Sequence, residues 1–125
     1  DEIDTNRKAS KKRIESTLLR YVEGLKGVKM LEKSDTCWFG TPFVCEDKTL
    51  KDKLVSFLED NMIQTRNYFA GNVLLHPGYA HLGELNDYPI GNTVLDKVFF
   101  LGAAPHYNED VFSYVEKVFK EKWEN

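Results

Sequence analysis

The sequence predicts an α/β two-layer sandwich, in which helices pack on a small sheet. Three segments carry apolar residues at helical spacing, namely residues 5–26, 49–61 and the stretch after Asn108. Three shorter segments have the composition of β-strands, namely residues 28–31, 36–45 and 97–103. Because helices and strands follow one another along only 125 residues, of which 42% are hydrophobic, a single domain with one core is expected.

The first predicted helix is amphipathic. Either Asp4 or Thr5 can cap its start, and either Gly24 or Gly27 can end it. Residues 1–33 contain nine basic and six acidic residues. We therefore interpret the basic cluster near the start as a solvated face of the helix rather than an anion-binding surface. The apolar stripe expected to enter the core consists of Ile14, Leu18, Tyr21, Val22 and Leu25.

The strand predicted over residues 36–45 is rich in aromatic residues and alternates between two sets of side chains, which predicts one face in the core. Pro42 has no backbone N–H to donate, which favours a sheet edge or a bulge at that position. The odd-numbered set consists of Cys37, Phe39, Phe43 and Cys45, and the even-numbered set of Trp38, Gly40, Pro42 and Val44.

The two later helices have caps and apolar stripes of their own. Thr49 and Asp52 are spaced like a capping box, and the polar run Asn108–Asp110 can cap the last helix. The second helix is expected to face inward with Leu50, Leu54, Phe57 and Leu58. The last helix is expected to bury Val111, Phe112, Val115, Val118, Phe119 and Trp123.

Residues 62–96 lack regular periodicity and are interpreted as a long loop with short elements inside it. The region is too rich in apolar and aromatic residues to be disordered, and long ordered loops are usually functional. Its glycines are Gly71, Gly78, Gly83 and Gly91. We therefore expect this region to be ordered and to carry function.

Composition excludes several classes of function. A net charge of −3 and a pI of about 5.6 argue against a general nucleic-acid binder. The longest apolar stretches, such as residues 98–101, are far shorter than the roughly 20 residues that a membrane-spanning helix needs. We expect no nucleic-acid or membrane partner.

The cysteines and histidines predict neither a disulfide nor a metal site. Cys37 and Cys45 lie eight residues apart in one predicted strand, which separates their Cα atoms by about 26 Å. Two such cysteines are interpreted as reduced thiols of a cytoplasmic protein. His76, His81 and His106 have no cysteine or histidine nearby at a ligand spacing, so none is expected to bind a metal.

One segment, residues 65–79, combines groups that can hold a phosphorylated ligand with a ring. A guanidinium such as that of Arg66 pairs with two phosphate oxygens, and Phe69 or a tyrosine can cover a sugar or base face. The alternative is a strand end where Arg66 forms an ion pair and the aromatic rings fill the core. Composition alone leaves both interpretations open.

Three motifs add a family resemblance. They are residues 37–42 (CWFGTP), residues 63–72 (IQTRNYFAGN), and residues 99–102 (FFLG) together with the helix start at 108–114. These resemble the C-terminal part of the DegT/DnrJ/EryC1/StrS family of sugar-nucleotide aminotransferases and dehydratases, which depend on pyridoxal phosphate. The Trp-Phe-Gly strand and the Thr-Arg turn resemble most the lipopolysaccharide branch that contains CDP-4-keto-6-deoxyglucose 3-dehydrase.

The resemblance implies that this chain is a fragment of a larger enzyme of fold-type I. Residues 1–33 would lead in from a missing large domain, and residues 34–125 would form the small C-terminal domain on the substrate side. Pyridoxal or pyridoxamine phosphate, the Schiff-base position and the cysteines of a possible 2Fe–2S cluster would all lie in the missing domain. The chain itself would then hold no catalytic residue, no coenzyme and no metal, and would be inactive alone.

By the same resemblance the enzyme would be a cytoplasmic nucleotide-sugar 3-dehydratase that makes a deoxysugar for the lipopolysaccharide O-antigen. We expect a homodimer, and a fragment that can form oligomers by swapping its first helix. Substrate contacts are expected from Arg66 (phosphate or sugar), Phe69 (an apolar wall near the reacting sugar), Asn72 (a hydroxyl contact or a loop-fixing group), and, more weakly, His76 and Tyr79.

Two alternatives stay open at this point. A nucleotide-sugar aminotransferase would differ by a lysine at the Schiff-base position upstream. A stand-alone α/β binding module without catalysis would have a coding sequence that starts near Asp1.

Overall fold

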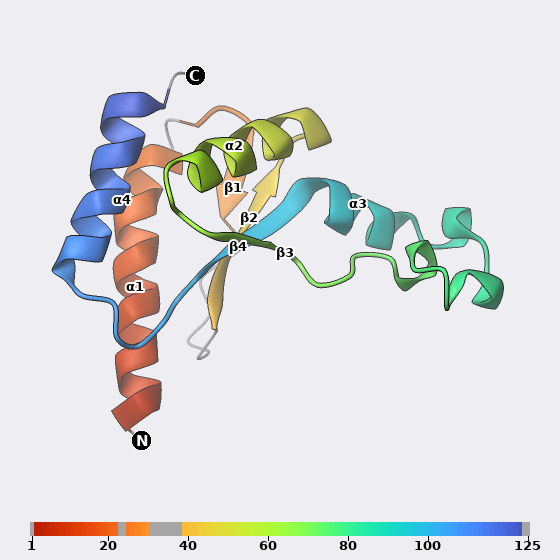
Figure 1. The fold of residues 1–125 in the computed structure, drawn as a ribbon, viewed down its shortest axis with the longest axis horizontal. Coiled ribbons are helices and arrows are strands. Elements are labelled where there is room, and N and C mark those ends of the chain that lie inside the picture. The colour runs from red at the N-terminus through yellow and green to blue at the C-terminus, as the bar shows by residue number, and fades with distance from the viewer. Residues whose placement is uncertain (1, 23–24, 31–38, 124–125) are drawn as a thin grey trace.

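The computed structural model describes residues 2–22, 25–30 and 39–123, and within them it shows a four-stranded antiparallel sheet packed by helices (Figure 1). The strands are β1 (Val28–Met30), β2 (Gly40–Cys45), β3 (Thr65–Asn67) and β4 (Val98–Gly102), in the order β1-β2-β4-β3. The helices are α1 (Glu2–Val22), α2 (Lys48–Asp60), α3 (Pro89–Lys97) and α4 (Glu109–Lys122). The predicted α/β sandwich with a small sheet is therefore confirmed.

The two faces of the sheet differ in burial. Phe43 pairs with Phe99, and Thr41 pairs with Leu101, so these side chains share one face, on which all four are buried. The same core cluster contains residues of α1, α2 and α4, which places these three helices on that face. The opposite face, which we call the outer face, is only partly covered; it includes Phe100 and, beside it on β3, the exposed Arg66.

Helix α1 packs against α4, and the predicted core residues Ile14 and Leu25 are buried. The predicted caps Asp4 and Thr5 are wrong, because the helix already includes both and begins at Glu2. Acidic residues in a first turn are favoured by the helix dipole, which accounts for the earlier start of the helix. The side chains of the other predicted stripe residues, Leu18, Tyr21 and Val22, lie outside the described part of the chain.

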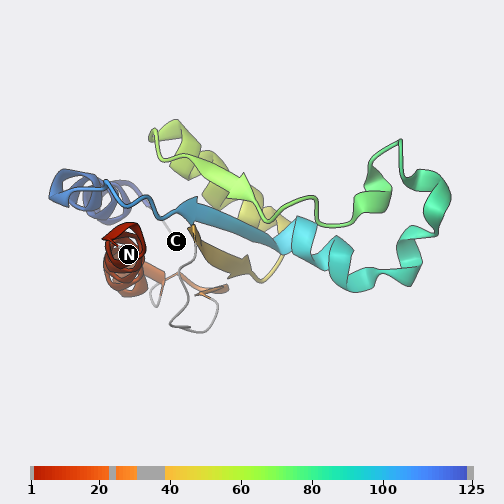
Figure 2. The same cartoon turned by 90° about the horizontal axis from the view of Figure 1, so that it is seen from below.

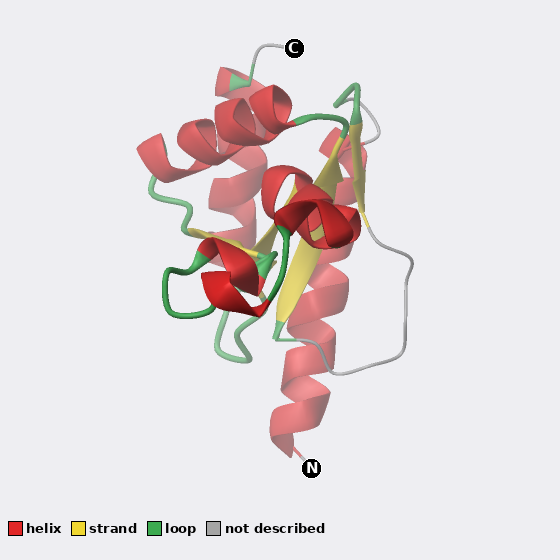
Figure 3. Ribbon diagram, turned by 90° about the vertical axis from the view of Figure 1, so that its right-hand side faces the viewer, coloured by secondary structure: helices red, strands yellow, loops and turns green. Residues whose placement is uncertain are grey.

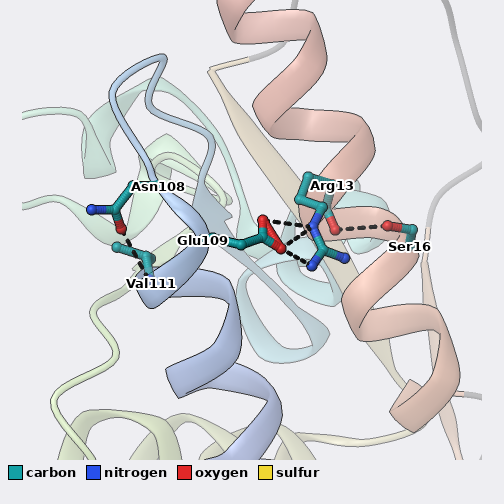
Figure 4. A network of polar contacts seen from close by, with 5 residues as sticks. All are labelled: Arg13, Ser16, Asn108, Glu109 and Val111. Atoms are coloured by element: carbon teal, nitrogen blue, oxygen red, sulfur yellow. Dashed lines mark hydrogen bonds and ion pairs between the residues drawn. The ribbon is translucent and has the colours of Figure 1, made fainter.

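An ion pair joins α1 to the first turn of α4 (Figure 4). The Nε atom of Arg13 donates to the two carboxylate oxygens of Glu109 at 3.1 and 3.3 Å, and the guanidinium lies 5.4 Å from the ring centroid of Phe112. The hydrogen bond from Arg13 lowers the pKa of Glu109. Nearby, the predicted cap Asn108 accepts a hydrogen bond from the Val111 amide at 3.2 Å, which confirms the start of α4.

The inward faces of α2 and α4 are mostly as predicted. Leu54, Leu58, Phe112, Val118 and Phe119 are buried, and Leu50, Phe57, Val115 and Trp123 are partly buried against the core. Val111 was predicted to be buried but is exposed, because the cavity described below separates it from β3.

The predicted capping box of α2 is wrong. Asp47, not Thr49, caps the helix, and its carboxylate accepts a hydrogen bond from the Leu50 amide at 2.8 Å. An aspartate one residue before the helix reaches that amide directly, so the helix begins at Lys48. Lys51, which the apolar pattern did not single out, is buried on the inward face.

The strand predicted over residues 36–45 is shorter at its start. Cys37 and Trp38 lie outside the described residues, and β2 begins at Gly40. Phe43 and Cys45 face the core, whereas Phe39 precedes the strand and contacts Phe100 on the outer face, with ring centroids 5.3 Å apart. The predicted sheet edge at Pro42 is wrong, because β2 is an inner strand between β1 and β4. Among the described residues, Pro42 pairs with Phe100 of β4, and the pairing with β1 extends as far as Phe43.

Residues 68–97, which we call the arm, connect β3 to β4 and project away from the sheet (Figures 1 and 2). In Figure 3 the arm lies in front of the sheet. It contains three short 3-10 helices, which fit the predicted long loop with short elements inside it, and the nine-residue helix α3, which was not predicted as a helix. Helix α3 buries no residue and has a glycine in its interior, which lowers the helical propensity of the segment.

Within the described residues, none of the helices is long and apolar enough to cross a membrane.

Candidate functional site

Arg66 lies on the edge strand β3, where it is exposed and opposite Phe100 of β4. When the Gln64 amide is oriented with its oxygen toward Arg66, it accepts hydrogen bonds from both terminal nitrogens of the guanidinium, at 3.0 and 3.2 Å. Glu59 is near enough for the positive charge of Arg66 to contribute to lowering its pKa, although the main cause is its hydrogen bonds with Thr65. Among the described residues Arg66 forms no ion pair, so its charge is available to an anion.

Four aromatic rings cluster beside Arg66 on the outer face. The ring centroids of Phe39 and Phe69 lie 6.0 Å apart, and those of Tyr68 and Phe69 lie 5.2 Å apart, both edge to face. Phe100 completes the cluster, at 6.4 Å from Tyr68. Phe69 is 66% exposed, so the cluster presents an aromatic surface rather than a buried core.

The backbone at Phe69 is strained. Its φ of 56° lies in the left-handed region, which large side chains rarely adopt. Its amide donates to the Asn67 carbonyl at 2.8 Å, which closes a tight turn directly after β3. Such a conformation costs about 1–3 kcal/mol and concentrates at functional sites, so the turn marks Phe69 as a candidate binding residue.

A cavity of about 420 Å³ opens on the other side of Arg66, between β3, the end of β4 and α4. Met62 lines it, is 88% exposed and also has a left-handed φ, of 60°. The polar lining includes Arg66 and Gln64. The remaining lining residues are largely apolar or aromatic: Ile14, Ile63, Phe100, Leu101, Gly102, Tyr107, Val111, Phe112, Tyr114 and Val115.

The structure brings Arg66 and Phe69 to one surface but places the other three predicted residues along the arm. Asn72 is 5% exposed; its side chain accepts from the Leu74 amide at 3.1 Å and donates to Asn92 at 2.9 Å, so it fixes the loop. His76 and Tyr79 are exposed at the ends of short 3-10 helices further out. Within the described residues no hydrogen bond or ring contact joins either of them to Arg66 or Phe69.

Sequence reasoning missed Met62, Phe100 and Lys51 at or near this site. Phe100 was placed in a strand without a role, and no signal marks Met62, because a methionine rarely takes the left-handed position after a helix. Lys51 did leave a signal: it is spaced three and seven residues before Leu54 and Leu58, on the apolar stripe of α2.

The described cysteine is not a reactive group. Cys45 is buried, and burial raises the pKa of its thiol to about 11. No group of three potential metal-binding side chains occurs among residues 2–22, 25–30 and 39–123.

The model of the DegT/DnrJ/EryC1/StrS aminotransferase family matches residues 1–120. The chain is 30% identical to the lipopolysaccharide biosynthesis protein RfbH of Salmonella typhimurium, over 97% of the chain and 29% of that protein. It is also 30% identical to a dTDP-4-dehydro-2,6-dideoxy-D-glucose 3-dehydratase of Saccharopolyspora spinosa, over 77% of the chain and 23% of that protein.

Solved structures share the fold. DesV of S. venezuelae, solved with a ketimine intermediate, superposes with a TM-score of 0.74 at 23% identity, over 99% of this chain and 33% of that one. An E. coli GDP-4-keto-6-deoxy-D-mannose-3-dehydratase with bound hydrated PLP superposes with a TM-score of 0.68 at 16% identity, over 92% and 31%. The chain thus spans about a third or less of the length of the proteins it matches.

Proposed function

Because the chain belongs to the DegT/DnrJ/EryC1/StrS aminotransferase family, we propose that it is the substrate-side domain of a nucleotide-sugar 3-dehydratase. In this proposal residues 34–125 form the small domain, and residues 1–33 lead in from a large domain outside this chain. The enzyme would be a cytoplasmic homodimer that makes a deoxysugar for the lipopolysaccharide O-antigen. The similarity to a protein named for lipopolysaccharide biosynthesis supports this pathway.

The observation that carries the proposal is the surface shared by Arg66 and Phe69. An exposed guanidinium without an ion pair among the described residues can bind two oxygens of a diphosphate. The exposed ring of Phe69, held in a strained turn, offers an apolar wall to a sugar. The adjoining cavity of about 420 Å³ has the size and mostly apolar lining of a small-molecule site.

The arm residues have different roles in the proposal. Asn72 acts as the loop-fixing group, because both ends of its amide are occupied within the arm. His76 and Tyr79 remain proposed substrate contacts, reached when the arm lies against the rest of the enzyme.

The described residues do not fit pyridoxal phosphate, the coenzyme bound in the similar E. coli 3-dehydratase. Among the described residues, the cavity beside Arg66 and the smaller one between α1 and α4 are lined by neither a lysine nor a histidine, so neither supplies an amine or an imidazole for the Schiff-base position. The buried Lys51 already donates to two protein oxygens and faces neither cavity. We therefore assign the coenzyme, and any iron–sulfur cluster, to the proposed large domain, and no chemical step to this chain.

The name of one sequence relative favours a dehydratase over an aminotransferase. One protein that is 30% identical to the chain is named a sugar 3-dehydratase, whereas the solved structures that share the fold include both sugar aminotransferases and 3-dehydratases. An aminotransferase remains the second candidate, and a lysine at the Schiff-base position of the complete enzyme would decide for it.

Substitution of Arg66 tests the proposed function. In the complete enzyme, R66A should raise KM or lower kcat at least tenfold, because a charge-assisted bond to phosphate is worth about 1.5–3 kcal/mol. The kinetic constants of R66K should lie between those of the wild type and R66A, since lysine keeps the charge but loses the planar pair of donors. The control is K29A, an exposed cation on the opposite edge strand β1. Wild-type kinetics for R66A would refute the substrate contact.

A further inference from the structure

Lys51 is a buried cation at the junction of the core and the arm. It is 5% exposed, on the face of α2 that also buries Leu54 and Leu58. Its Nζ donates to the side-chain oxygen of Asn67 at 2.9 Å and to the backbone carbonyl of Leu95 at 2.6 Å. Both bonds span long stretches of sequence, so they join three elements rather than neighbours in one helix.

The two acceptors lie at the two ends of the arm, one directly before it and one in its last helix. Asn67 is the last residue of β3, directly before the arm begins, and Leu95 lies in the last turn of α3, just before β4. The ends also touch each other: a Cβ at Gly71 would lie 2.4 Å from the Cβ of Leu95, so only glycine fits there. Gly71 has a φ of +64°, which independently favours glycine.

Asn67 also connects Lys51 to the candidate site. The same residue whose side chain accepts from Lys51 uses its backbone carbonyl to accept from the Phe69 amide at 2.8 Å. The position of Asn67 therefore sets the tight turn in which Phe69 holds its left-handed conformation.

We propose that Lys51 is a positioning residue, which clamps both ends of the arm and so holds the turn that presents Phe69 to substrate. The proposal rests on the proposed function for the role of Phe69, but the clamp itself does not.

The chemistry of Lys51 supports a role beyond packing. Burial disfavours its charged form and lowers the pKa of the amine, so an apolar side chain would fill the same space without this cost. The carbonyl of Leu95 belongs to the C-terminal turn of α3, where the helix dipole favours a cation. The two hydrogen bonds offset part of the free-energy cost of burying the charged amine. Because their acceptors lie at the two ends of one segment, the amine is suited to hold that segment in place.

Two variants of Lys51 and one of its neighbour test the clamp. K51M keeps the length of the side chain and removes its donors, whereas K51R keeps a cation with donors. K48M is the matched control, because Lys48 lies on the same helix but is exposed and paired with Asp52. The first measurement is amide hydrogen exchange, with protection in α4 as the internal reference.

K51M should speed exchange at least tenfold at residues 67–71 and 94–97 and leave α4 unchanged, while K48M should match the wild type. In the complete enzyme, K51M should lower kcat/KM for the nucleotide-sugar at least tenfold, and K51R should recover part of the loss. Unchanged exchange at the arm ends in K51M would overturn the clamp. Faster exchange with wild-type kinetics would overturn the positioning role.

A second variant covers the case in which K51M does not fold. N67A removes one acceptor at an exposed position and leaves Lys51 intact, so it should loosen residues 67–71 more than residues 94–97. Equal protection in N67A and the wild type would overturn the proposal. The proposed function fails by a different measurement. Wild-type kinetics in R66A would overturn that function, whatever hydrogen exchange the Lys51 variants show.

Discussion

The core and the arm of this molecule are held together by different means. The core buries apolar residues of three strands (β1, β2 and β4) and three helices in one cluster, with Phe99 and Leu54 almost fully enclosed. Among the described residues the arm buries only Asn72 and Leu74. Instead, it exposes many large apolar side chains: Phe69, Val73, Leu75, Tyr79, Leu82, Leu85, Tyr88 and Ile90.

The difference shows what sets the shape of each region. Burial of apolar surface stabilises the core, whereas the arm relies on local caps such as Asn72 and on the clamp at Lys51. Exposed apolar residues in this number are typical of a surface that contacts something else. The arm is thus suited to contact the rest of the proposed enzyme or its substrate, and the core to carry it.

Two alanine variants, one in the core and one in the arm, test whether the two regions contribute differently to stability. F99A removes a ring that is 1% exposed and stacked 5.3 Å from Phe43, and should lower the free energy of unfolding by about 3–5 kcal/mol. L82A removes an exposed side chain of the arm and should change it by less than about 0.5 kcal/mol. Urea denaturation followed by circular dichroism measures both.

A loss of similar size in the two variants would contradict the division into a packed core and a weakly packed arm. It would mean that the arm contributes to global stability through contacts comparable to those of the core.

The same division explains how much of the fold could be predicted from the sequence. In the core, periodic apolar residues indicated α1, α2, α4 and the strands β1, β2 and β4, because burial selects for that periodicity. In the arm α3 buries no residue and has a glycine in its interior, and residues 62–96 were predicted only as a long loop with short elements inside it. β3 has the sequence Thr-Arg-Asn and contains no apolar residue, so no apolar pattern indicated a strand there.

The candidate site could be predicted only in part for a similar reason. Arg66 and Phe69 were found because they are unusual residue types close together in sequence. Phe39, Phe100 and Lys51 reach the same place from distant parts of the chain, through the register of β4 and the packing of α2. A single sequence does not contain that register, so these residues needed the structure.

The buried hydroxyl of Thr41 tests whether an unsatisfied polar group lowers the stability of the core. Thr41 faces the core at 1% exposure, and its hydroxyl has no hydrogen-bond partner among the described residues. T41V replaces the hydroxyl with a methyl group of similar size and should raise the free energy of unfolding by about 1 kcal/mol. The measurement is again urea denaturation. A loss of stability would reveal a partner for the hydroxyl in the folded protein.

The smallest expected effect concerns the strand from which the arm starts. Glu59, at the end of α2, accepts hydrogen bonds from the Thr65 amide at 2.6 Å and from the Thr65 hydroxyl at 2.7 Å, and these bonds lower the pKa of its carboxyl below the ordinary 4.5. The folded protein therefore binds this proton less readily than the unfolded chain does. The stabilisation is present above pH 4.5 and is lost as the pH falls through the lowered pKa.

E59Q keeps an acceptor oxygen but cannot titrate, so it should remove this part of the pH dependence. Because Glu59 is exposed and its charge is screened, the difference between wild type and E59Q should change by only about 0.5 kcal/mol between pH 6 and pH 3. Urea denaturation at both pH values measures the change, and hydrogen exchange at Thr65 locates it. Identical pH profiles for the two proteins would contradict the prediction, because they would show that the bonds from Thr65 do not lower the pKa of Glu59 in the folded protein.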